Sequence, residues 1–384
     1  MDSFDIIIAG GGMVGQSFAL SMADQDLKIA IVEPNNSNPT LNDQFHTRVS
    51  AITPKSENLL EKLGAWNLIK RKYAFTDTKV WDQNSHGHLN FSSADEGLDH
   101  LGYIIENDVI QSALFEALSN TKVEFISAKL EGIKKTDDGY QVQLDNQDQI
   151  SCHLLVAADG ARSRIRELSG IDFSETDYQQ KAIVCNIESE KGFENTTWQR
   201  FLSDSIIALL PLSDTQASIV WSAESPLADE LTSLSTDEFS SRLSAGVEYQ
   251  FGQFKVLSKI QAFPLIERSA KEYVKENLVL IGDAAHNIHP LAGQGVNLGF
   301  SDVKELSDQL KSSSKILGDY GVLRSYARAR RLDNELMAKT MTGLNWIYKE
   351  NNEPLRWLRG FGMNLINDNP TLKSFFQKHA TGKL

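Results

Sequence analysis

The chain has 384 residues, of which 41% are hydrophobic and 23% charged, an ordinary composition for a globular protein with a sizeable core. The formal net charge of −13 argues against non-specific binding to nucleic acid, so we expect no nucleic-acid partner. No run approaches the roughly 18 apolar residues of a membrane span, and the acidic N-terminus lacks the features of a targeting segment. The two cysteines, Cys152 and Cys185, lie in apolar runs and are interpreted as buried thiols in a reducing compartment. We therefore expect a cytoplasmic protein.

The first segment has the pattern of a βαβ unit. Residues 4–10 form a short apolar, β-branched run that is typical of a buried strand. Residues 11–25 have helical spacing, and residues 28–34 predict a second buried strand, which Pro34 ends. A strand, a helix and a strand in such quick succession predict a parallel sheet.

The following part of the chain alternates helices and strands. Residues 56–71 and 106–120 have the spacing of amphipathic helices. Residues 123–145 alternate around turn signals, as in a β-meander, and residues 151–160 predict another buried strand.

The middle of the chain changes character. Residues 179–263 show spaced strand patterns, interrupted by one helix-like stretch at 236–249. We expect an antiparallel sheet here, to which residues 76–100 add a hairpin. The α/β pattern resumes at 277–286. The tail, residues 301–384, is helical in pattern and mildly basic, with 14 Lys/Arg and 9 Asp/Glu.

A glycine motif, G-x-G-x-x-G, joins the first strand to its helix. Gly10 allows the tight turn, Gly12 lets the backbone approach a pyrophosphate, and Gly15 lets the helix pack closely on the sheet. The helix N-terminus offers N–H groups and a partial positive charge to phosphates. Glu33 ends the second strand, where an acid can accept hydrogen bonds from an adenosine ribose. Because this acid repels a 2′-phosphate, the motif predicts FAD or NAD rather than NADP.

Two later segments carry further motifs. Residues 155–166 (LVAADGARSRIR) contain an Asp-Gly pair followed by Ser163 and Arg166. Residues 282–299 (GDAAHNIHPLAGQGVNLG) contain Gly-Asp, then His-x-x-Pro, then Gly-Gln-Gly-x-Asn. Together with the N-terminal motif, these segments resemble the single-component flavoprotein aromatic hydroxylases of the para-hydroxybenzoate hydroxylase type, over nearly the whole chain.

The chemistry of the third motif agrees with this resemblance. Asp283 closes a buried strand, where its carboxylate can accept hydrogen bonds from the ribityl hydroxyls of a flavin. Gly293, Gly295 and Asn297 allow backbone N–H groups to lie close to a flat ring. Donors placed there would stabilise an anionic reduced flavin.

Within this family, the chain is most similar to the branch that hydroxylates the ring of ubiquinone precursors. The segments that carry the likeness are residues 48–66, 101–118, 197–201 and 263–270. Many relatives carry Arg where this chain has Asn107, at the start of a predicted helix. The resemblance therefore leaves the flavin contact at this helix open, with Gln111 as the other candidate.

The patterns and the resemblance together predict an α/β fold. It comprises a glutathione-reductase-type, FAD-binding Rossmann domain with a β-meander, an inserted antiparallel-sheet substrate domain and a C-terminal helical region. The predicted limits are residues 1–75, 101–178 and 264–316 for the FAD-binding domain, 76–100 and 179–263 for the substrate domain, and 317–384 for the C-terminal helices.

The resemblance also implies which residues form the site. The expected FAD contacts are Gly10, Gly12, Met13, Val14, Gly15, Glu33, Arg48, Gln111, Asp159, Gly160, Gly282, Asp283, Pro290, Gly293, Gln294, Gly295, Val296 and Asn297. The candidates for a part in catalysis are Arg48, His289 and Pro290, and His289 is also interpreted as packing on the flavin. The spacing of Asp283, His286 and His289 would suit a metal, but the flavin motif accounts for all three, so we expect no metal.

The implied activity is an FAD-dependent monooxygenation. NADPH or NADH reduces the flavin, O₂ adds to form a C4a-hydroperoxide, and one oxygen atom enters the ring of a polyprenylated phenol or quinol. Since no second dinucleotide motif follows a strand, we expect the nicotinamide donor to have no dinucleotide-binding domain of its own. The resemblance implies that it docks transiently. The alternatives are hydroxylation of a small phenol, a prenyl reductase or halogenase on the same scaffold, and an FAD-bound scaffold of a biosynthetic complex.

The C-terminal tail mixes aromatic, leucine and basic residues at 345–349, 355–366 and 374–378. One interpretation is that these helices pack on the FAD-binding domain. The other is a surface for peripheral membrane contact or for other proteins of ubiquinone biosynthesis, which would suit a water-insoluble substrate.

Overall fold

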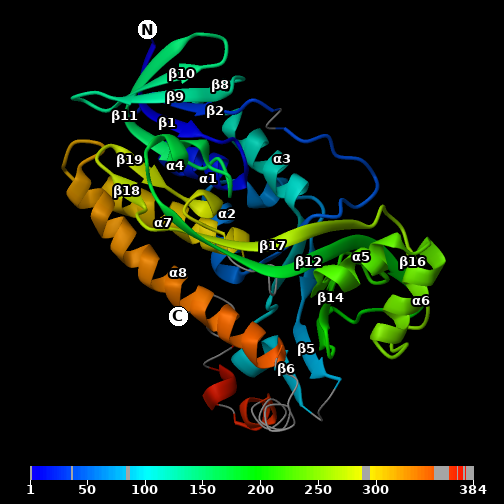
Figure 1. The fold of residues 1–384 in the computed structure, drawn as a ribbon. Coiled ribbons are helices and arrows are strands. Elements are labelled where there is room, and N and C mark those ends of the chain that lie inside the picture. The colour runs from blue at the N-terminus through cyan, green and yellow to red at the C-terminus, as the bar shows by residue number, and fades with distance from the viewer. Residues whose placement is uncertain are drawn as a thin grey trace.

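The computed structural model describes residues 2–35, 38–83, 87–287, 295–349, 363–369, 371–374 and 377, with the backbone alone for 336–349. The chain forms three sheets, two of which are large and joined by long strands (Figure 1). The predicted α/β fold class is confirmed. The proposed domain limits stay a prediction.

The first sheet has eight strands and contains the N-terminal βαβ unit. In spatial order, its main path runs through β18 (Val274–Lys275), β19 (Leu278–Leu280), β11 (Gln149–Ala157), β1 (Asp2–Ala9), β2 (Ile29–Val32) and β8 (Glu124–Ile126). The strands β19, β11, β1, β2 and β8 are parallel to their neighbours, and β2 and the second half of β1, residues 6–9, are buried. This burial explains why the strands read as continuous apolar runs.

An antiparallel extension and a helical layer complete this part of the molecule. The strands β9 (Leu130–Lys135) and β10 (Tyr140–Leu144) extend the sheet from β11, as the meander pattern predicted. The predicted meander began at residue 123, but its first strand, β8, instead pairs in parallel with β2. The helices α1 (Met13–Met22), α3 (Asn107–Leu118) and α7 (Gly295–Ser312) pack together, and α8 (Tyr320–Lys349) contacts α7 and β18.

The second sheet has nine strands. In spatial order, its main path runs through β20 (His286–Asn287), β17 (Gln261–Ala270), β12 (Phe173–Ser189), β15 (Gln216–Glu224), β14 (Ser205–Pro211), β13 (Thr196–Phe201), β5 (Asp77–Asp82) and β6 (His88–Ser92), and β16 (Phe254–Val256) pairs with β12. One face is buried beneath α5 (Ser225–Ser233) and α6 (Thr236–Gly246), where Trp198, Ile219 and Trp221 belong to the core.

This sheet departs from the prediction at one position. The hairpin of β5 and β6 joins it, but β5 pairs with β13 in parallel. An antiparallel pair can be joined by a short turn, whereas β5 comes from a distant segment and enters the sheet in the other direction.

A three-stranded sheet lies between the two large ones and was not anticipated. It consists of β3 (Val49–Ile52), β7 (Gly102–Glu106) and β4 (Tyr73–Phe75). Its side chains Phe75, Leu101 and Ile104 form an apolar cluster with Leu210 and Leu212 of the nine-stranded sheet. These contacts join the three-stranded sheet to the nine-stranded one.

One helix prediction was wrong in extent, and helix α5 was not predicted. The helix expected over 56–71 ends as α2 (Pro54–Lys62), because Gly64 takes a left-handed conformation with φ +75°, and a short 3₁₀ turn follows at Trp66–Leu68. Helix α5 precedes the expected helix and was missed, although Pro226 near its start is a typical helix-opening residue.

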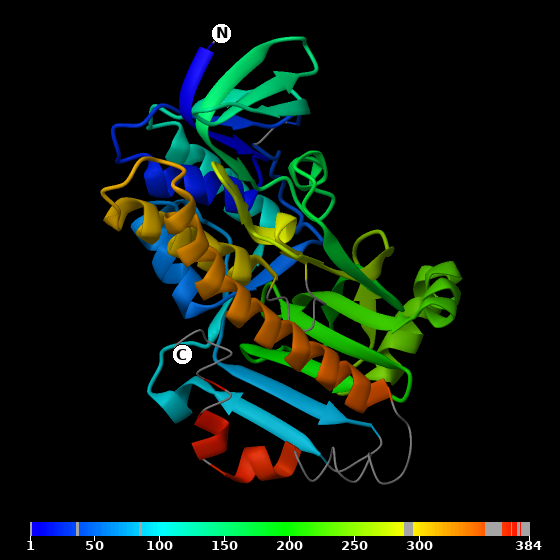
Figure 2. The same ribbon diagram turned by 60° about the vertical axis from the view of Figure 1, so that its left-hand side comes forward.

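The C-terminal region spans the molecule (Figure 2). Helix α8 begins against the first sheet, but the described tail residues contact the β5–β6 hairpin of the second. Asn364 and Asn367 accept hydrogen bonds from the backbone N–H groups of His88 and Asn90. These side chains satisfy groups that an edge strand would leave open. In the described residues, no helix is long and apolar enough to cross a membrane.

Both cysteines are free and buried, as predicted. Burial raises the pKa of the Cys152 and Cys185 thiols to about 12. At pH 8 the thiolate, which is the reactive form, is then about one part in ten thousand of each thiol.

We expect Ellman's reagent to leave the folded protein unmodified and to modify two thiols per chain in urea. Rapid reaction of either cysteine in the folded protein would contradict this burial.

Candidate active site

Three turns meet at one edge of the first sheet. The strands β1, β11 and β19 are adjacent and parallel, so residues 10–12, 158–160 and 281–283 all follow carboxyl ends of neighbouring strands. In open α/β sheets, ligands bind at this edge. The topology therefore brings together the three motifs, which lie far apart in the sequence.

The first two turns touch directly at Gly10. Gly10 has φ +107°, and a Cβ there would lie well under 3.0 Å from the carbonyl of Ala158. A Cβ at Gly15 would lie equally close to the carbonyl of Gly10. These two glycines are therefore required for the close packing of the turns and of α1, as the motif predicted.

The N-terminus of α1 faces open space. A Cβ at Gly12 would meet none of the described atoms within 4 Å, and the helix has neither a side-chain cap nor an acidic residue in its first turn. An uncapped helix N-terminus favours an anion. Met13 and Val14 begin this helix, and Val14 lies against Gly282 and Gly299.

Glu33 reaches across from the end of β2 to the glycine turn. Its Oε2 accepts a hydrogen bond from the N–H of Gly11 at 2.9 Å, and its Oε1 accepts from the backbone N–H of Asn35 at 3.0 Å. Oε1 also accepts from Nδ2 of Asn35 at 3.1 Å, so Asn35 occupies both of its lone pairs. The carboxylate thus lies at the same edge as the glycine turn, and among the described residues Oε2 keeps a second lone pair for a ligand hydroxyl.

The third turn presents Asp283 beside the N-terminus of α1. It forms a short 3₁₀ turn, Gly282–Ala284, with φ +59° at Gly282. The Asp283 side chain is accessible, yet the loss of bulk water around it raises the pKa of its carboxyl, and the charges of His286 and Arg48 act in the opposite direction. Arg48 and Asp283 therefore belong to one electrostatic neighbourhood.

A buried polar network behind this turn was not foreseen. Asp302 of α7 is fully buried, and its Oδ2 accepts from the N–H of Gly282 at 2.9 Å and lies 2.6 Å from Nε2 of His286. Its Oδ1 accepts from Nε of Arg330 at 2.8 Å. Although burial favours the neutral acid, His286 and Arg330 outweigh it and lower the pKa of Asp302.

The sequence does contain a signal for this network. Asp302 falls on the stripe of α7 that also carries Val303 and Leu306, which are buried. A charged residue on the apolar stripe of a helix predicts a buried partner. Only the fold identifies Arg330 as that partner.

The Asp-Gly motif caps a helix and keeps one oxygen unpaired. Oδ2 of Asp159 accepts from the N–H groups of Arg164 and Ile165, at the start of α4 (Arg164–Leu168). Its Oδ1 is buried and has no hydrogen-bond partner among the described residues. Burial raises the pKa of this carboxyl. A Cβ at Gly160 would meet no atom within 4 Å.

The segment at Arg48 is fixed by the start of α3. The carbonyl of Arg48 accepts from the N–H of Asn107 at 2.9 Å, while Oδ1 of Asn107 accepts from Oγ of Ser50 at 2.7 Å. Nε2 of Gln111 donates to the carbonyl of Gly11 at 3.3 Å. Gln111 therefore contacts the glycine turn, whereas the Asn107 side chain supports β3.

The last predicted motif is only partly described. Nδ2 of Asn297 donates to the carbonyl of Ala51 at 2.8 Å, and its Oδ1 accepts from the N–H of Thr53 at 3.2 Å. Asn297 thus joins α7 to the start of α2. A Cβ at Gly295 would meet no atom of the part of the chain that the structure describes within 4 Å, and Val296 packs on the neighbouring apolar cluster. His289, Pro290, Gly293 and Gln294 lie outside the described residues.

Comparison with known proteins identifies the family. A model of the FAD binding domain family matches residues 3–340. The chain belongs to this family. It is 34% identical over 386 residues to 3-demethoxyubiquinol 3-hydroxylase of Escherichia coli (strain K12), covering 98% of each chain. It is 33% identical to the mitochondrial ubiquinone biosynthesis monooxygenase COQ6 of Mus musculus, covering 98% of this chain and 91% of the relative. FAD is the cofactor, and the predicted resemblance is confirmed.

Solved structures show the same fold. PqsL of Pseudomonas aeruginosa, in complex with 2-aminobenzoylacetate, superposes with a TM-score of 0.79 at 21% identity, covering 94% of this chain and 99% of PqsL. The p-nitrophenol 4-monooxygenase PnpA of Pseudomonas putida gives 0.78 at 18% identity, covering 98% and 97%.

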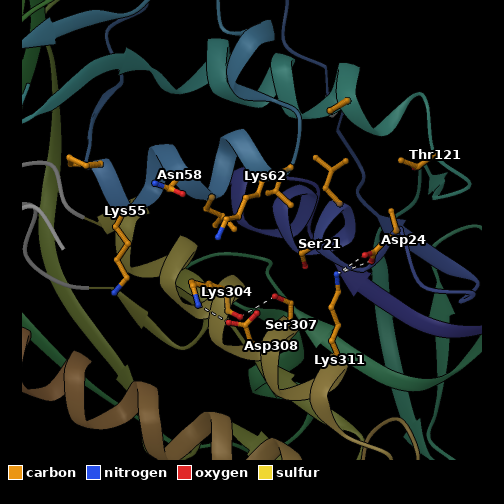
Figure 3. Close-up of a pocket in the computed structure, with 16 residues that line it drawn as sticks. Ser21, Asp24, Lys55, Asn58, Lys62, Thr121, Lys304, Ser307, Asp308 and Lys311 are labelled. Carbon is orange, nitrogen blue, oxygen red and sulfur yellow. Dashed lines mark hydrogen bonds and ion pairs between the residues drawn. The ribbon is translucent and has the colours of Figure 1, made fainter. Parts of the chain in front are cut away.

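A groove on the outer side of the helical layer is separate from this site (Figure 3). Its volume is about 820 Å³, and it lies between α1, α2, α7 and the end of α3. None of the three turns lines it. Leu20, Leu59 and Leu63 contribute an apolar part of its lining, and Lys311 is paired with Asp24.

The two later glycines of the motif predict opposite outcomes for alanine. At Gly12 the new methyl meets no protein atom, so we expect unfolding free energy of the FAD-free protein within about 0.5 kcal/mol of wild type. FAD affinity of Gly12→Ala should fall about tenfold because the methyl enters the ligand space.

In Gly15→Ala the methyl meets the Gly10 carbonyl, and the free energy of unfolding should fall by about 1–3 kcal/mol. Urea unfolding and flavin fluorescence titration measure both. Unchanged FAD binding by Gly12→Ala would contradict this placement.

Proposed function

We propose that this chain is an FAD-dependent monooxygenase that hydroxylates the ring of a polyprenylated phenol or quinol in ubiquinone biosynthesis. NADH or NADPH would donate electrons, and O₂ would supply the oxygen atom. The names of the relatives that match almost the whole chain support this activity. The site supports it independently, through its fit to the cofactor and through the chemistry of the neighbouring sheet.

The convergence of the three turns is the observation that carries the assignment of the site. Three glycines at its border leave space for a ligand, since a Cβ at Gly12, Gly160 or Gly295 would meet no atom of the described residues within 4 Å. The unpaired Oδ1 of Asp159 and the accessible Asp283 add acceptors. An uncapped helix, open glycines and carboxylates suit a ligand with both phosphates and hydroxyls.

Each group then has a proposed part in holding FAD. The N-terminus of α1 and Gly12 would bind the pyrophosphate, and Glu33 would accept from the adenosine ribose. Asp283 would accept from the ribityl hydroxyls, and Arg48 would lie beside the flavin. When bound, FAD supplies the redox chemistry that activates O₂. The protein orients the ring system and excludes water from it.

The open face of the nine-stranded sheet suits an uncharged substrate. Side chains alternate between the two faces of a strand, so Val184, Ala208 and Val220 face away from α5 and α6. Neither β14 nor β15 contains Lys, Arg or His. These strands therefore offer no cationic clamp for a substrate carboxylate, whereas small apolar side chains accommodate a phenol ring with a prenyl chain.

The segment at Arg48 joins this face to the cofactor site. Nδ2 of Asn186 donates to the carbonyl of Phe45 at 2.6 Å, and Oγ of Ser218 donates to the carbonyl of Thr47 at 3.1 Å. A cavity of about 390 Å³ lies here, with Arg48 and Phe263 in its lining. We place the approach to the flavin at this junction.

The proposed pathway role also bears on partners. Peripheral membrane contact through the C-terminal region, and association with other proteins of ubiquinone biosynthesis, would give access to a polyprenylated substrate. Vesicle sedimentation of the chain with and without residues 350–384 tests the membrane contact, and equal sedimentation of the two would exclude a role for these residues.

The activity is tested with purified holoprotein, NADH or NADPH, and a demethoxyubiquinol with a short prenyl chain. We expect ¹⁸O from ¹⁸O₂ in the hydroxylated product, detected by mass spectrometry, in step with nicotinamide oxidation. A charged analogue, 4-hydroxybenzoate, serves as the comparison and should be a poor substrate, because β14 and β15 offer no cation to its carboxylate. Absence of oxygen consumption with every prenylphenol would reject the monooxygenase assignment in favour of an FAD-bound scaffold.

A further inference from the structure

The turn that presents Asp283 is held on both sides by buried charged side chains. On one side, the Asp302 carboxylate accepts from the N–H of Gly282 at 2.9 Å. On the other, Nη1 of Arg166 donates to the carbonyl of Ala284 at 2.8 Å. Both side chains are buried, so these hydrogen bonds are sheltered from water. Asp283 is the residue between them and is the accessible member of the turn.

Asp302 in turn is held by α8. Arg330 is 5% exposed and uses all three of its guanidinium nitrogens. Nε donates to Asp302 at 2.8 Å, Nη1 donates to Asp333 at 2.8 Å, and Nη2 donates to Asn334 at 2.9 Å. A guanidinium bound at two points within its own helix and at one point on the helix opposite has little freedom to move. The position of Asp302 is therefore tied to α8.

The same helix also secures the strand that leads into the turn. Oη of Tyr326, one turn before Arg330, donates to the carbonyl of Leu280 at 2.9 Å. Tyr326 is fully buried. Helix α8 thus reaches the Gly282–Ala284 turn by two routes, directly through the strand and indirectly through Asp302.

We propose that Asp302 is a positioning residue for the cofactor, which fixes the Asp283 carboxylate through the N–H of Gly282 and is itself fixed by Arg330 of α8. This rests on the proposed contact between Asp283 and FAD. Asp302 is fully buried and bonded to Gly282, His286 and Arg330, so its effect on FAD is indirect and comes from the geometry of the turn. The general physical reason is that a ligand-binding side chain gains affinity when its support cannot relax.

The test uses the rate of FAD release from the holoprotein, followed by the rise in flavin fluorescence. Asp302→Asn keeps the shape but places an amide donor against His286 or Arg330, and Arg330→Gln removes the cation. We expect each to release FAD about tenfold faster or more, and the double variant to be no faster than the faster single variant, because the two act as one unit. Arg330→Lys keeps the charge and should fall closer to wild type.

The control is Arg200→Gln, in the nine-stranded sheet. Arg200 is also buried, 3% exposed, and bonded to the carbonyl of Gly246 and to Glu248, so its loss should lower the melting temperature. It has no link to the turn, and FAD release should stay within about twofold of wild type. Release by Asp302→Asn within twofold of wild type, or equal acceleration in Arg200→Gln at the same loss of melting temperature, would overturn the proposal.

A further variant separates this inference from the proposed function. Asp283→Asn should accelerate FAD release if Asp283 contacts the cofactor. If Asp283→Asn has an effect and Asp302→Asn has none, the positioning role is wrong and the site assignment stands. If Asp283→Asn itself releases FAD at the wild-type rate, the proposed contact at Asp283 fails and the inference fails with it.

Discussion

The parallel pairing of β1 with β11, and of β11 with β19, is the constraint on which the site depends. It brings three turns to one edge of the sheet, and the contact between Gly10 and Ala158 leaves no room for a side chain between the first two. A parallel sheet places all of its carboxyl ends on the same side, so every strand added beside β1 contributes another turn to the same ligand. The buried support behind the turns, from Asp302 and Arg166, has meaning only because of this arrangement.

The two large sheets divide the chemistry between them. The first provides a helix N-terminus, carboxylates and open glycines, which suit a charged, hydroxyl-rich cofactor. The second turns a face of small, uncharged side chains toward the segment at Arg48, which suits an apolar ring. The three-stranded sheet and the Phe45–Arg48 segment lie between them, and their hydrogen bonds to Asn186 and Ser218 set how the two faces meet. A hydroxylase needs both surfaces at one point, because the ring must lie close to the flavin.

Much of the fold could be predicted because its signals are local. Glycine spacing between a strand and a helix, and the acid at Glu33, identified the nucleotide-binding unit, and the roles of Gly10 and Gly15 in packing are visible in the structure. The end of α2 at Gly64 and the parallel entry of β5 were missed, since one depends on a left-handed residue and the other on a partner more than 100 residues away. The Asp302–Arg330 pair could not be derived for the same reason. An aspartate on the apolar stripe of a helix predicts a buried partner, but the packing of α7 on α8 determines which residue that partner is.

The parallel pair of β5 and β13 has a consequence for how the protein folds during its synthesis. The chain emerges from the ribosome in order, yet β1 must wait for β11 and then β19, while β5 must wait for β13. Neither large sheet is complete until most of the chain has been made, and such long-range closures are slow and leave apolar edges open. Strands of the two sheets therefore alternate along the chain, and both sheets are completed late in synthesis. No single cut of the chain separates the two large sheets without also separating strands from their partners. The smallest part of the chain that we expect to fold on its own is therefore nearly the whole chain.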